Sequence, residues 1–252
     1  MSIPRFSFET WVKWVFDHSV AAKGEKEWWF CVPDADEGGR WLDRPPWRVI
    51  NYMTRLFEDP VPPLKPYSDE QIDQGLWFIF NNSNSRHIDC LHSEQVSLAH
   101  RRRCIRAIAP LYRKLILPRS AEEIQACLNP PGRPLNSIGY MLWDIVCDAS
   151  WRPWEPMKRR RIAKRAFGGR AGGSPYFPKD LKIKREILCT LSELVTVPHL
   201  AGQEAAIHGL GHIEQELRGS SREIIDRFLA EHPDLHPKLR EYALQAREGK
   251  IQ

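Results

Sequence analysis

The chain has 252 residues, of which 42% are hydrophobic and 27% are charged, and its formal net charge is +5. This composition is typical of a soluble globular protein, and it excludes collagen, a mucin-like stalk and general disorder. A chain of this length can bury roughly 70 to 75% of its unfolded surface, so it needs no disulfide or metal to maintain a core. We expect a single domain over residues 1–252, or two closely packed ones.

The first twenty residues place aromatic side chains at helical spacing, but Arg5, Glu9, Lys13 and Asp17 interrupt them. A secretory signal peptide has an uninterrupted apolar core, so this segment is predicted to belong to the fold. No stretch approaches the roughly 20 apolar residues that a membrane-spanning helix needs. The sequence therefore predicts a cytoplasmic protein with no membrane partner.

Six cysteines are scattered along the chain without any C-x-x-C spacing. This pattern argues against a disulfide framework and against a cysteine-based zinc site. Most of them are expected to be small buried side chains in a reducing compartment. The six are Cys31, Cys90, Cys104, Cys127, Cys147 and Cys189.

Helical signals dominate the sequence. Three segments, 68–71, 120–123 and 220–223, have a serine followed three residues later by Glu or Gln, as in a capping box, so each is predicted to start a helix. Apolar residues with a period near 3.6 follow the first and the last of these segments, and others precede Gly249, where the last helix is predicted to end. We find no alternating strand pattern and no hairpin turn, so the predicted fold class is all-α.

Proline-rich segments at 44–46, 59–66 and 129–134 are expected to separate helices, because proline lacks a backbone donor and disfavours helix before it. Residues 179–252 have the pattern of four helices of roughly 10 to 17 residues with very short turns, as in stacked antiparallel helix pairs of the HEAT or armadillo kind. No helix pair aligns with another at a fixed period. An irregular helical bundle is therefore the alternative.

Tryptophan is concentrated in an N-terminal segment, residues 1–58. Six of the ten tryptophans lie there: Trp11, Trp14, Trp28, Trp29, Trp41 and Trp47. The first interpretation is that these rings fill irregular packing where the segment wraps a helical body. The second is a recognition surface, because tryptophan is enriched at binding sites and can stack on bases. Burial of Trp28 and Trp29 would favour the first interpretation.

Five segments carry a resemblance to a family: QGLWF (74–78), CIRA (104–107), YMLWDI (140–145), EAAIHGLGH (204–212) and LREYAL (239–244). They are similar to segments of an uncharacterised bacterial family of all-helical proteins. The resemblance covers most of the chain outside the basic segment described below. It implies a helical fold and no established activity, so it assigns no functional residue.

The sharpest polar pattern is a ridge at i, i+4 spacing, formed by Glu204, His208, His212 and Glu216. The apolar face of the same predicted helix is formed by Ala206, Leu210, Ile213 and Leu217. On a helix the ridge therefore points away from the local core. Two histidines one turn apart can bind a divalent metal ion, and the flanking carboxylates could complete or orient the site. The H-E-x-x-H motif of zinc proteases is absent, because Gly209 follows His208.

Gly209 and Gly211 lower the helix propensity of this segment, which indicates that another backbone or a ligand approaches closely there. Three interpretations of the ridge stay open: a metal or catalytic site using His208 and His212, a polar groove for a protein partner, and a packed or solvated structural face. The sequence alone favours the structural one.

Other histidines have simpler interpretations. His87 and His92 are five residues apart and do not share a helix face, so a helix end is expected there. His232 and His236 each precede a proline and bracket a predicted turn between helices.

The strongest electrostatic feature is the basic segment, residues 158–185, with a glycine-rich insertion at about 158–178 that is expected to be flexible. It can be a solvated loop, bind nucleic-acid phosphates without sequence preference, or contact an acidic protein partner. Nearby tryptophans could add a stacking platform. The residues involved are Lys158, Arg159, Arg160, Arg161, Lys164, Arg165 and Arg170, with Trp151 and Trp154.

Arg101, Arg102 and Arg103 cannot all face one ligand, because successive helical residues point in different directions. Asp144 or Asp148 is a possible internal partner for one of them. Nucleophile motifs such as G-x-S-x-G are absent.

The sequence therefore favours a non-enzymatic helical protein that binds a protein partner, as a scaffold, adaptor or immunity-type protein, and it indicates no cofactor. One alternative is a nucleic-acid-binding helical-repeat protein that uses the basic segment. A second alternative is a metal-dependent enzyme at Glu204, His208, His212 and Glu216.

Overall fold

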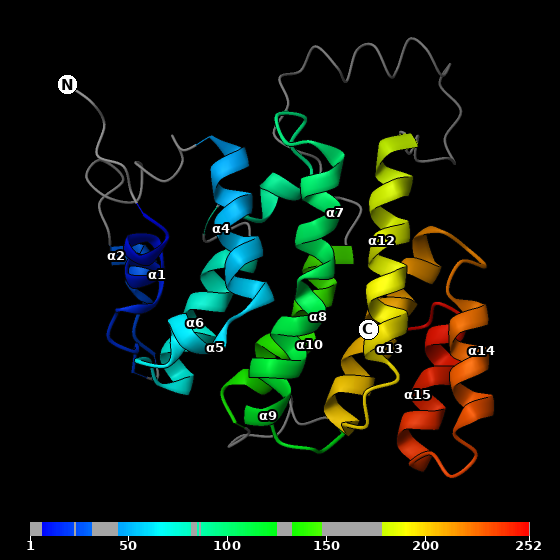
Figure 1. Ribbon diagram of the computed structural model, residues 1–252. Helices are drawn as coiled ribbons and strands as arrows, with labels where there is room; N and C mark the ends of the chain where they lie inside the picture. The colour runs from blue at the N-terminus through cyan, green and yellow to red at the C-terminus, as the bar shows by residue number, and fades with distance from the viewer. Residues whose placement is uncertain are drawn as a thin grey trace.

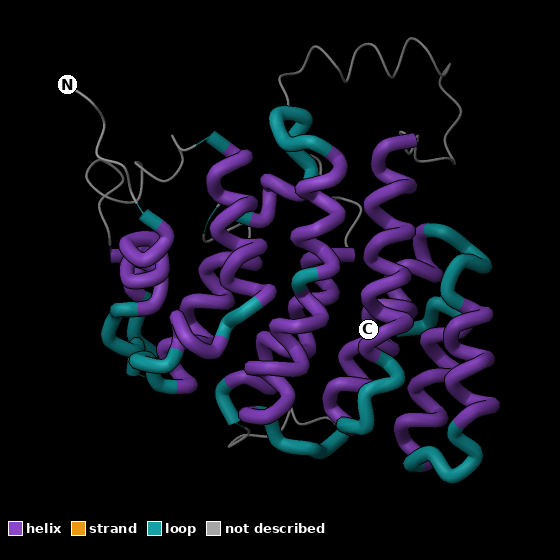
Figure 2. The backbone as a smooth tube through the Cα atoms, in the orientation of Figure 1, coloured by secondary structure: helices purple, strands orange, loops and turns teal. Residues whose placement is uncertain are grey.

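The structure is a computed structural model that describes residues 7–22, 24–31, 45–81, 85, 87–124, 133–147 and 178–251. Within these ranges the chain is helical or forms loops and turns, and none of it is a strand (Figure 2). The all-α prediction is confirmed for this part of the chain. None of the described helices is both long enough and apolar enough to cross a bilayer.

The N-terminal helices lie beside each other at one end of the molecule (Figure 1). They are α1 (Phe8–Phe16), α2 (Trp28–Cys31), α4 (Pro46–Glu58), α5 (Val61–Leu64) and α6 (Asp69–Phe80). Helix α1 packs on α5 and α6, and α4 packs on helices that lie between residues 88 and 111. The predicted capping box at Ser68 is confirmed: its hydroxyl accepts from the backbone N–H of Gln71, and the Gln71 side chain accepts from that of Ser68.

Tryptophan side chains join α1 and α2 to the core. Trp11 is fully buried, and Trp28 is also buried, with its ring against Trp14 and Phe78 at centroid distances of 5.3 and 4.7 Å. Trp29 is partly buried against the same core. These four tryptophans therefore serve packing, as the first interpretation expected, whereas Trp47 is 49% exposed. Trp41 lies outside the described residues.

The middle of the chain forms a series of short helices, which is almost continuous from residue 98 to residue 119. It consists of η1 (Ile88–Leu91), α7 (Leu98–Arg106), α8 (Ile108–Leu111), a π-helical turn η2 (Tyr112–Ile116) and α9 (Leu117–Arg119). Pro110 and Pro118 lie in this run. Because proline has no backbone N–H, regular i to i−4 bonding is broken at both positions, which explains the change to wider helical turns.

The predicted helix start at Ser120 is wrong over residues 121–124, which form bends and turns. The Ser120 hydroxyl donates to the carbonyl of Ile116 instead of capping a new helix. The backbone of Ala121 bonds on both its N–H and its C=O with the side chain of Asn136, in helix α10 (Leu135–Cys147). These bonds direct the chain away from a helical path at this point.

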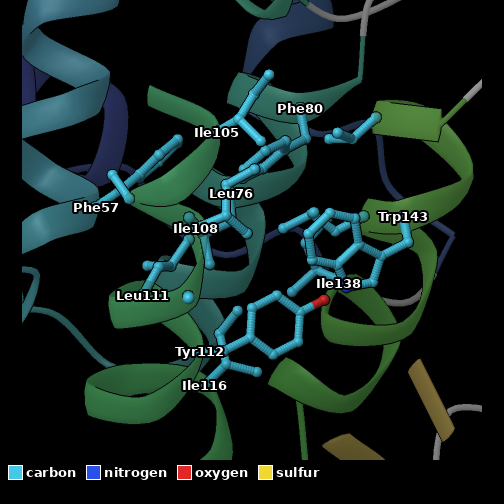
Figure 3. Packing of buried hydrophobic residues seen from close by; sticks show 14 of the residues in the cluster. Phe57, Leu76, Phe80, Ile105, Ile108, Leu111, Tyr112, Ile116, Ile138 and Trp143 are labelled. Carbon is cyan, nitrogen blue, oxygen red and sulfur yellow. The ribbon is translucent and has the colours of Figure 1, made fainter. Parts of the chain in front are cut away.

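Helix α10 is held in the apolar core by large side chains (Figure 3). Trp143 is fully buried, with its ring stacked on that of Tyr112 at 5.8 Å, and Tyr112 donates a hydrogen bond to the Gly139 carbonyl. Phe80 and Leu76 of α6 lie in the same cluster (Figure 3). This packing fixes the rotation of α10 about its axis, and it therefore fixes the direction of the Asp144 side chain, which follows Trp143.

Four helices form the C-terminal part of the chain, as predicted. They are α12 (Pro178–Leu194), α13 (Leu200–Glu216), α14 (Arg222–Glu231) and α15 (Pro237–Arg247). Helix α13 is central: α10, α12 and α15 all pack against it, and α14 packs on α15. The last helix ends before Gly249, whose φ is +65°, as predicted. HEAT-like stacking of these helices stays a prediction.

Helix α14 begins one residue later than the predicted capping box at 220–223, and its N-cap residue Ser221 makes no side-chain cap bond. The carboxylate of Glu214 in α13 does the capping instead. It accepts from the backbone N–H groups of Gly219 and Ser221, from the Ser221 hydroxyl and from Arg222. The helix was therefore predicted correctly and its cap was not.

The side chains of four cysteines are described, and all four are free thiols. Cys90, Cys104 and Cys147 are buried, as expected for small apolar side chains, whereas Cys189 is exposed. The side chain of Cys31 and the whole of Cys127 lie outside what the structure describes.

Candidate metal centre

The predicted histidine ridge lies inside the structure and not on its surface. Glu204 and His208 are 6% and 1% exposed, and His212 is partly buried. The expectation that the ridge points away from the core is therefore wrong. The reason is that other helices pack on α13 from several sides: α12 packs on it, and α10 and α15 pack on the face that carries His208.

Asp144 of α10 completes a group with the two histidines. Its Oδ1 lies 2.7 Å from Nε2 of His208 and also contacts Nε2 of His212. The two Nε2 atoms are 3.2 Å apart. One ligand atom from each of the three residues lies within 4.8 Å of the other two. Ligands of one first-row metal ion, at bond lengths of about 2.1 Å, are separated by about 3.0 to 3.4 Å. The two Nε2 atoms have this separation, whereas Asp144 Oδ1 is in direct contact with both, so an ion would have to move the carboxylate outward.

The other ring nitrogen of His208 meets two phenols. Its Nδ1 lies 2.8 Å from the hydroxyl of Tyr140 in α10 and 2.5 Å from that of Tyr242 in α15. The two hydroxyls are 2.7 Å apart. His208 is thus contacted through both ring nitrogens by groups from two neighbouring helices, and its ring orientation is fixed.

The electrostatics of the group favour a charged carboxylate. Partial burial alone would raise the pKa of Asp144, but hydrogen bonds from His208 and His212 bring that pKa below its ordinary value. Burial raises the pKa of Tyr242 well above its ordinary value, and the bond with Tyr140 raises it further. The site therefore combines the carboxylate of Asp144 with two imidazoles and two phenolic hydroxyl groups, of which that of Tyr242 stays protonated.

Access to the group is one-sided. The side chain of His208 is 1% exposed, while those of His212 and Asp144 are each 24% exposed. Solvent therefore reaches the group past His212 and Asp144. A metal ion there would have three protein ligands and further coordination positions on the exposed side.

Gly209 and Gly211 of α13 allow its neighbours to come close, as predicted, and the nearest protein atoms belong to side chains and not to another backbone. A Cβ at Gly209 would lie 2.8 Å from Leu191 Cδ2 and 3.0 Å from Trp143 Cβ, and one at Gly211 would lie 2.7 Å from Ile251. Gly209 therefore sets the short separation of α10 and α13 that brings Asp144 to the histidines.

The two glutamates of the predicted ridge have different outcomes. Glu204 is buried one turn before His208, but it is not in the group of three possible ligands. The pKa of Tyr242 is raised mainly by burial and by Tyr140, and the charge of Glu204 raises it further. The side chain of Glu216 is not described. The carboxylate that completes the group comes from a different helix.

The other histidines occupy helix ends, as expected. His87 and His92 cap the two ends of η1. His87 is buried, and its Nε2 accepts a 3.0 Å hydrogen bond from the indole N–H of Trp11. His232 ends α14 and His236 precedes α15, so these two bracket the predicted turn.

The arginine cluster has partners other than Asp144. Arg102 pairs with the buried carboxylate of Glu186, and Arg103 pairs with Glu58. The predicted pairing with Asp144 is therefore wrong for Arg102 and Arg103, because the Asp144 side chain contacts histidines of α13 instead. Asp148 lies outside the described residues.

Most of the basic segment, with every predicted nucleic-acid-binding side chain, lies outside the described residues. These side chains are Lys158, Arg159, Arg160, Arg161, Lys164, Arg165, Arg170, Trp151 and Trp154. At the end of the segment, Lys182 and Arg185 are exposed in α12, but Lys184 is buried and donates to the carbonyl of Cys147. Lys184 therefore does not belong to an exposed basic surface.

Sequence reasoning missed Asp144 as a partner of the histidines, and it missed both tyrosines. One signal was present: Asp144 is the single charged residue in the apolar helix α10, and Tyr140 precedes it by one turn. A lone carboxylate in such a helix must find a partner when the helix is buried.

Comparison with protein-family models, with curated proteins and with solved structures found no match for this chain.

Proposed function

We propose that this protein is a metal-dependent enzyme whose ion is held by Asp144, His208 and His212. One observation carries the proposal: three side chains from two helices have ligand atoms within 4.8 Å of one another. Two of these residues, Asp144 and His208, are 64 residues apart in the sequence. This corresponds to the second alternative of the sequence analysis, with Asp144 in place of the glutamates.

The donor set favours a first-row transition metal ion. Two imidazoles and one carboxylate suit Zn²⁺ or Fe²⁺, whereas Mg²⁺ and Ca²⁺ prefer oxygen ligands alone. Structural zinc sites have four protein ligands, whereas catalytic ones have three and keep a position open. The partial exposure of His212 and Asp144 supports the open kind.

Metal-assisted hydrolysis is the reaction class that this arrangement supports best. A bound ion of this kind supplies Lewis acidity, which polarises carbonyl or phosphoryl oxygens and makes water a better nucleophile at neutral pH. The protein would contribute the rigid positions of its three ligands on α10 and α13. The absence of an H-E-x-x-H motif separates this site from that class of zinc proteases.

Two proposals from the sequence have less support. A helical scaffold would bind its partner through the polar groove predicted at Glu204, His208, His212 and Glu216, but Glu204 and His208 are buried. Nucleic-acid binding depends on the basic segment, residues 158–185, of which residues 158–177 lie outside the described residues, and it predicts affinity that falls steeply with salt. The family resemblance adds no activity to any of these.

Metal content tests the proposal directly. Untagged protein purified without chelator, or reloaded with Zn²⁺ and desalted, is expected to hold one equivalent of metal by mass spectrometry. Asp144→Ala, His208→Ala and His212→Ala are each expected to lose it. His236→Ala is the matched control, because His236 is exposed at the start of α15 and does not belong to the group of possible ligands. Wild-type protein without metal, or ligand variants that retain it, would contradict the metal centre.

Activity tests the catalytic part separately. The reloaded protein is assayed on chromogenic phosphodiester, phosphomonoester and carboxylic ester substrates. Turnover that stops with chelator, returns with Zn²⁺ and is absent in Asp144→Ala supports hydrolysis. Stoichiometric metal with no turnover of any of these substrates contradicts the hydrolase assignment and leaves the metal centre in place.

A further inference from the structure

Three polar atoms form a triangle on the Nδ1 side of the His208 ring. They are Nδ1 of His208 and the hydroxyl oxygens of Tyr140 and Tyr242, at separations of 2.8, 2.5 and 2.7 Å. Each atom comes from a different helix, α13, α10 and α15 respectively. Either hydroxyl is therefore within hydrogen-bond distance of Nδ1, and each is within reach of the other.

A neutral imidazole carries one proton, and its position depends on what occupies the other nitrogen. Without a metal ion, the proton of His208 can lie on Nε2 and be donated to Asp144, 2.7 Å away. A hydroxyl of the triangle then donates to Nδ1. When a metal ion takes Nε2, the proton must lie on Nδ1, and it requires an acceptor there.

We infer that Tyr140 and Tyr242 are positioning residues that act as interchangeable partners for Nδ1 of His208, donating to it when the site is empty of metal and accepting from it when metal is bound. This inference rests on the proposed metal centre. Hydroxyl groups can reverse direction because each is both donor and acceptor, whereas a carboxylate or a backbone carbonyl could only accept. The site can thus gain and lose its ion without leaving a buried nitrogen of His208 unpaired.

The redundancy of the two phenols gives the inference a specific signature. Tyr140→Phe leaves the Tyr242 hydroxyl 2.5 Å from Nδ1, and Tyr242→Phe leaves the Tyr140 hydroxyl at 2.8 Å. Each single variant keeps one partner and is expected to bind Zn²⁺ almost as tightly as wild type. The double variant keeps neither. It is expected to lose 10- to 100-fold in affinity, about the usual loss when the outer partner of a metal-bound histidine is removed.

The experiment measures Zn²⁺ affinity by competition with a chromophoric chelator for wild type, both single variants and the double variant. Tyr67→Phe is the control, because Tyr67 is a half-buried tyrosine packed near α1. Thermal unfolding of the metal-free proteins separates loss of folding from loss of affinity. A double variant that unfolds like wild type but binds weakly supports the inference.

Nitrogen-15 NMR of histidine-labelled protein gives a second readout, which a purely structural role of the tyrosines would not change. The proton of His208 is expected on Nε2 in chelator-treated protein and on Nδ1 after Zn²⁺ is added. Equal affinity of the double variant and wild type, or additive losses in the single variants, would overturn the inference while the metal centre stands. Absence of Zn²⁺ binding in wild type would instead overturn the proposed function.

Discussion

Buried histidines in this protein differ in what their ring nitrogens contact. At His87, Nε2 accepts from the Trp11 indole and Nδ1 lies 2.9 Å from the hydroxyl of Ser85, so the ring bonds with neutral partners. At His208, Nε2 faces a carboxylate and a second imidazole. The first environment is structural, and the second is one in which a cation would be stabilised. Sequence spacing alone cannot separate the two, since both depend on residues distant in the chain.

The buried histidines also predict how stability depends on pH. Burial lowers the pKa of His87 to about 3, and burial with the nearby Lys184 and Arg101 lowers that of His92 to about 4. Both pKa values are below the ordinary histidine value of 6.5. At a pH between the lowered value and 6.5, the unfolded chain therefore binds more protons than the folded chain. The free energy of unfolding is therefore expected to fall as pH decreases from 6.5 towards 4, by up to about 1.4 kcal/mol per pH unit for each histidine.

Urea unfolding of wild type and His87→Gln at pH 7 and pH 5 measures this effect. Glutamine keeps an acceptor for Trp11 but does not titrate, so the variant is expected to lose less stability between the two pH values. Comparison within one protein pair is needed because Asp73 acts in the opposite direction: burial raises its pKa to about 7, which favours the folded state as pH falls. Equal losses in both proteins would contradict the assignment to His87.

At the scale of helices, the sequence predicted starts and ends well where the signals are local. The Ser68 capping box and the end of α15 before Gly249 depend on residues within one turn. The cap of α14 depends instead on Glu214 of the preceding helix, and the path after Ser120 depends on Asn136 of the following one. Both failures arise because a side chain from another element replaced the expected local bond.

Replacing Glu214 tests this account of α14. The side chain of Glu214 is 1% exposed and accepts four hydrogen bonds, including two from backbone N–H groups. Glutamine turns one acceptor oxygen into a donor that faces other donors, so Glu214→Gln is expected to cost about 1 to 3 kcal/mol of unfolding free energy. Glu223→Gln, at the position that the capping box favoured, is expected to change stability by less than about 0.5 kcal/mol. A larger loss of stability in Glu223→Gln than in Glu214→Gln would contradict this account and support the local capping box at residues 220–223.

At the scale of the whole molecule, the spacing of the histidine ridge could be predicted from the sequence, whereas its burial and its partner residues could not. His208 and His212 share one helix, so their spacing is visible in the chain. Asp144 lies on another helix, and its approach depends on Gly209 and on the burial of Trp143, which are properties of the packed structure. The same packing places Tyr242 of α15 against His208. The candidate site is therefore a meeting point of three helices, and only one of them carries a motif.

Under the proposed function, an ion held between α10 and α13 would also stabilise the fold. An ion that binds only the folded chain stabilises it by about 2.7 kcal/mol when its free concentration is 100 times Kd. For a chain of this size, 1 kcal/mol corresponds to about 2 to 4 °C in Tm, so Zn²⁺ is expected to raise Tm by about 5 to 10 °C. Differential scanning calorimetry with and without Zn²⁺ measures the shift.

The double variant His208→Ala, His212→Ala should show no such shift, whereas His236→Ala should retain it. The comparison matters because Zn²⁺ can also bind exposed histidines and the unfolded chain, and these contributions are shared by wild type and by the His236→Ala control. Loss of the shift on removing two residues of α13 alone would show that the stabilisation arises where the helices meet. An equal shift in the double variant would place the ion elsewhere and contradict the site at Asp144.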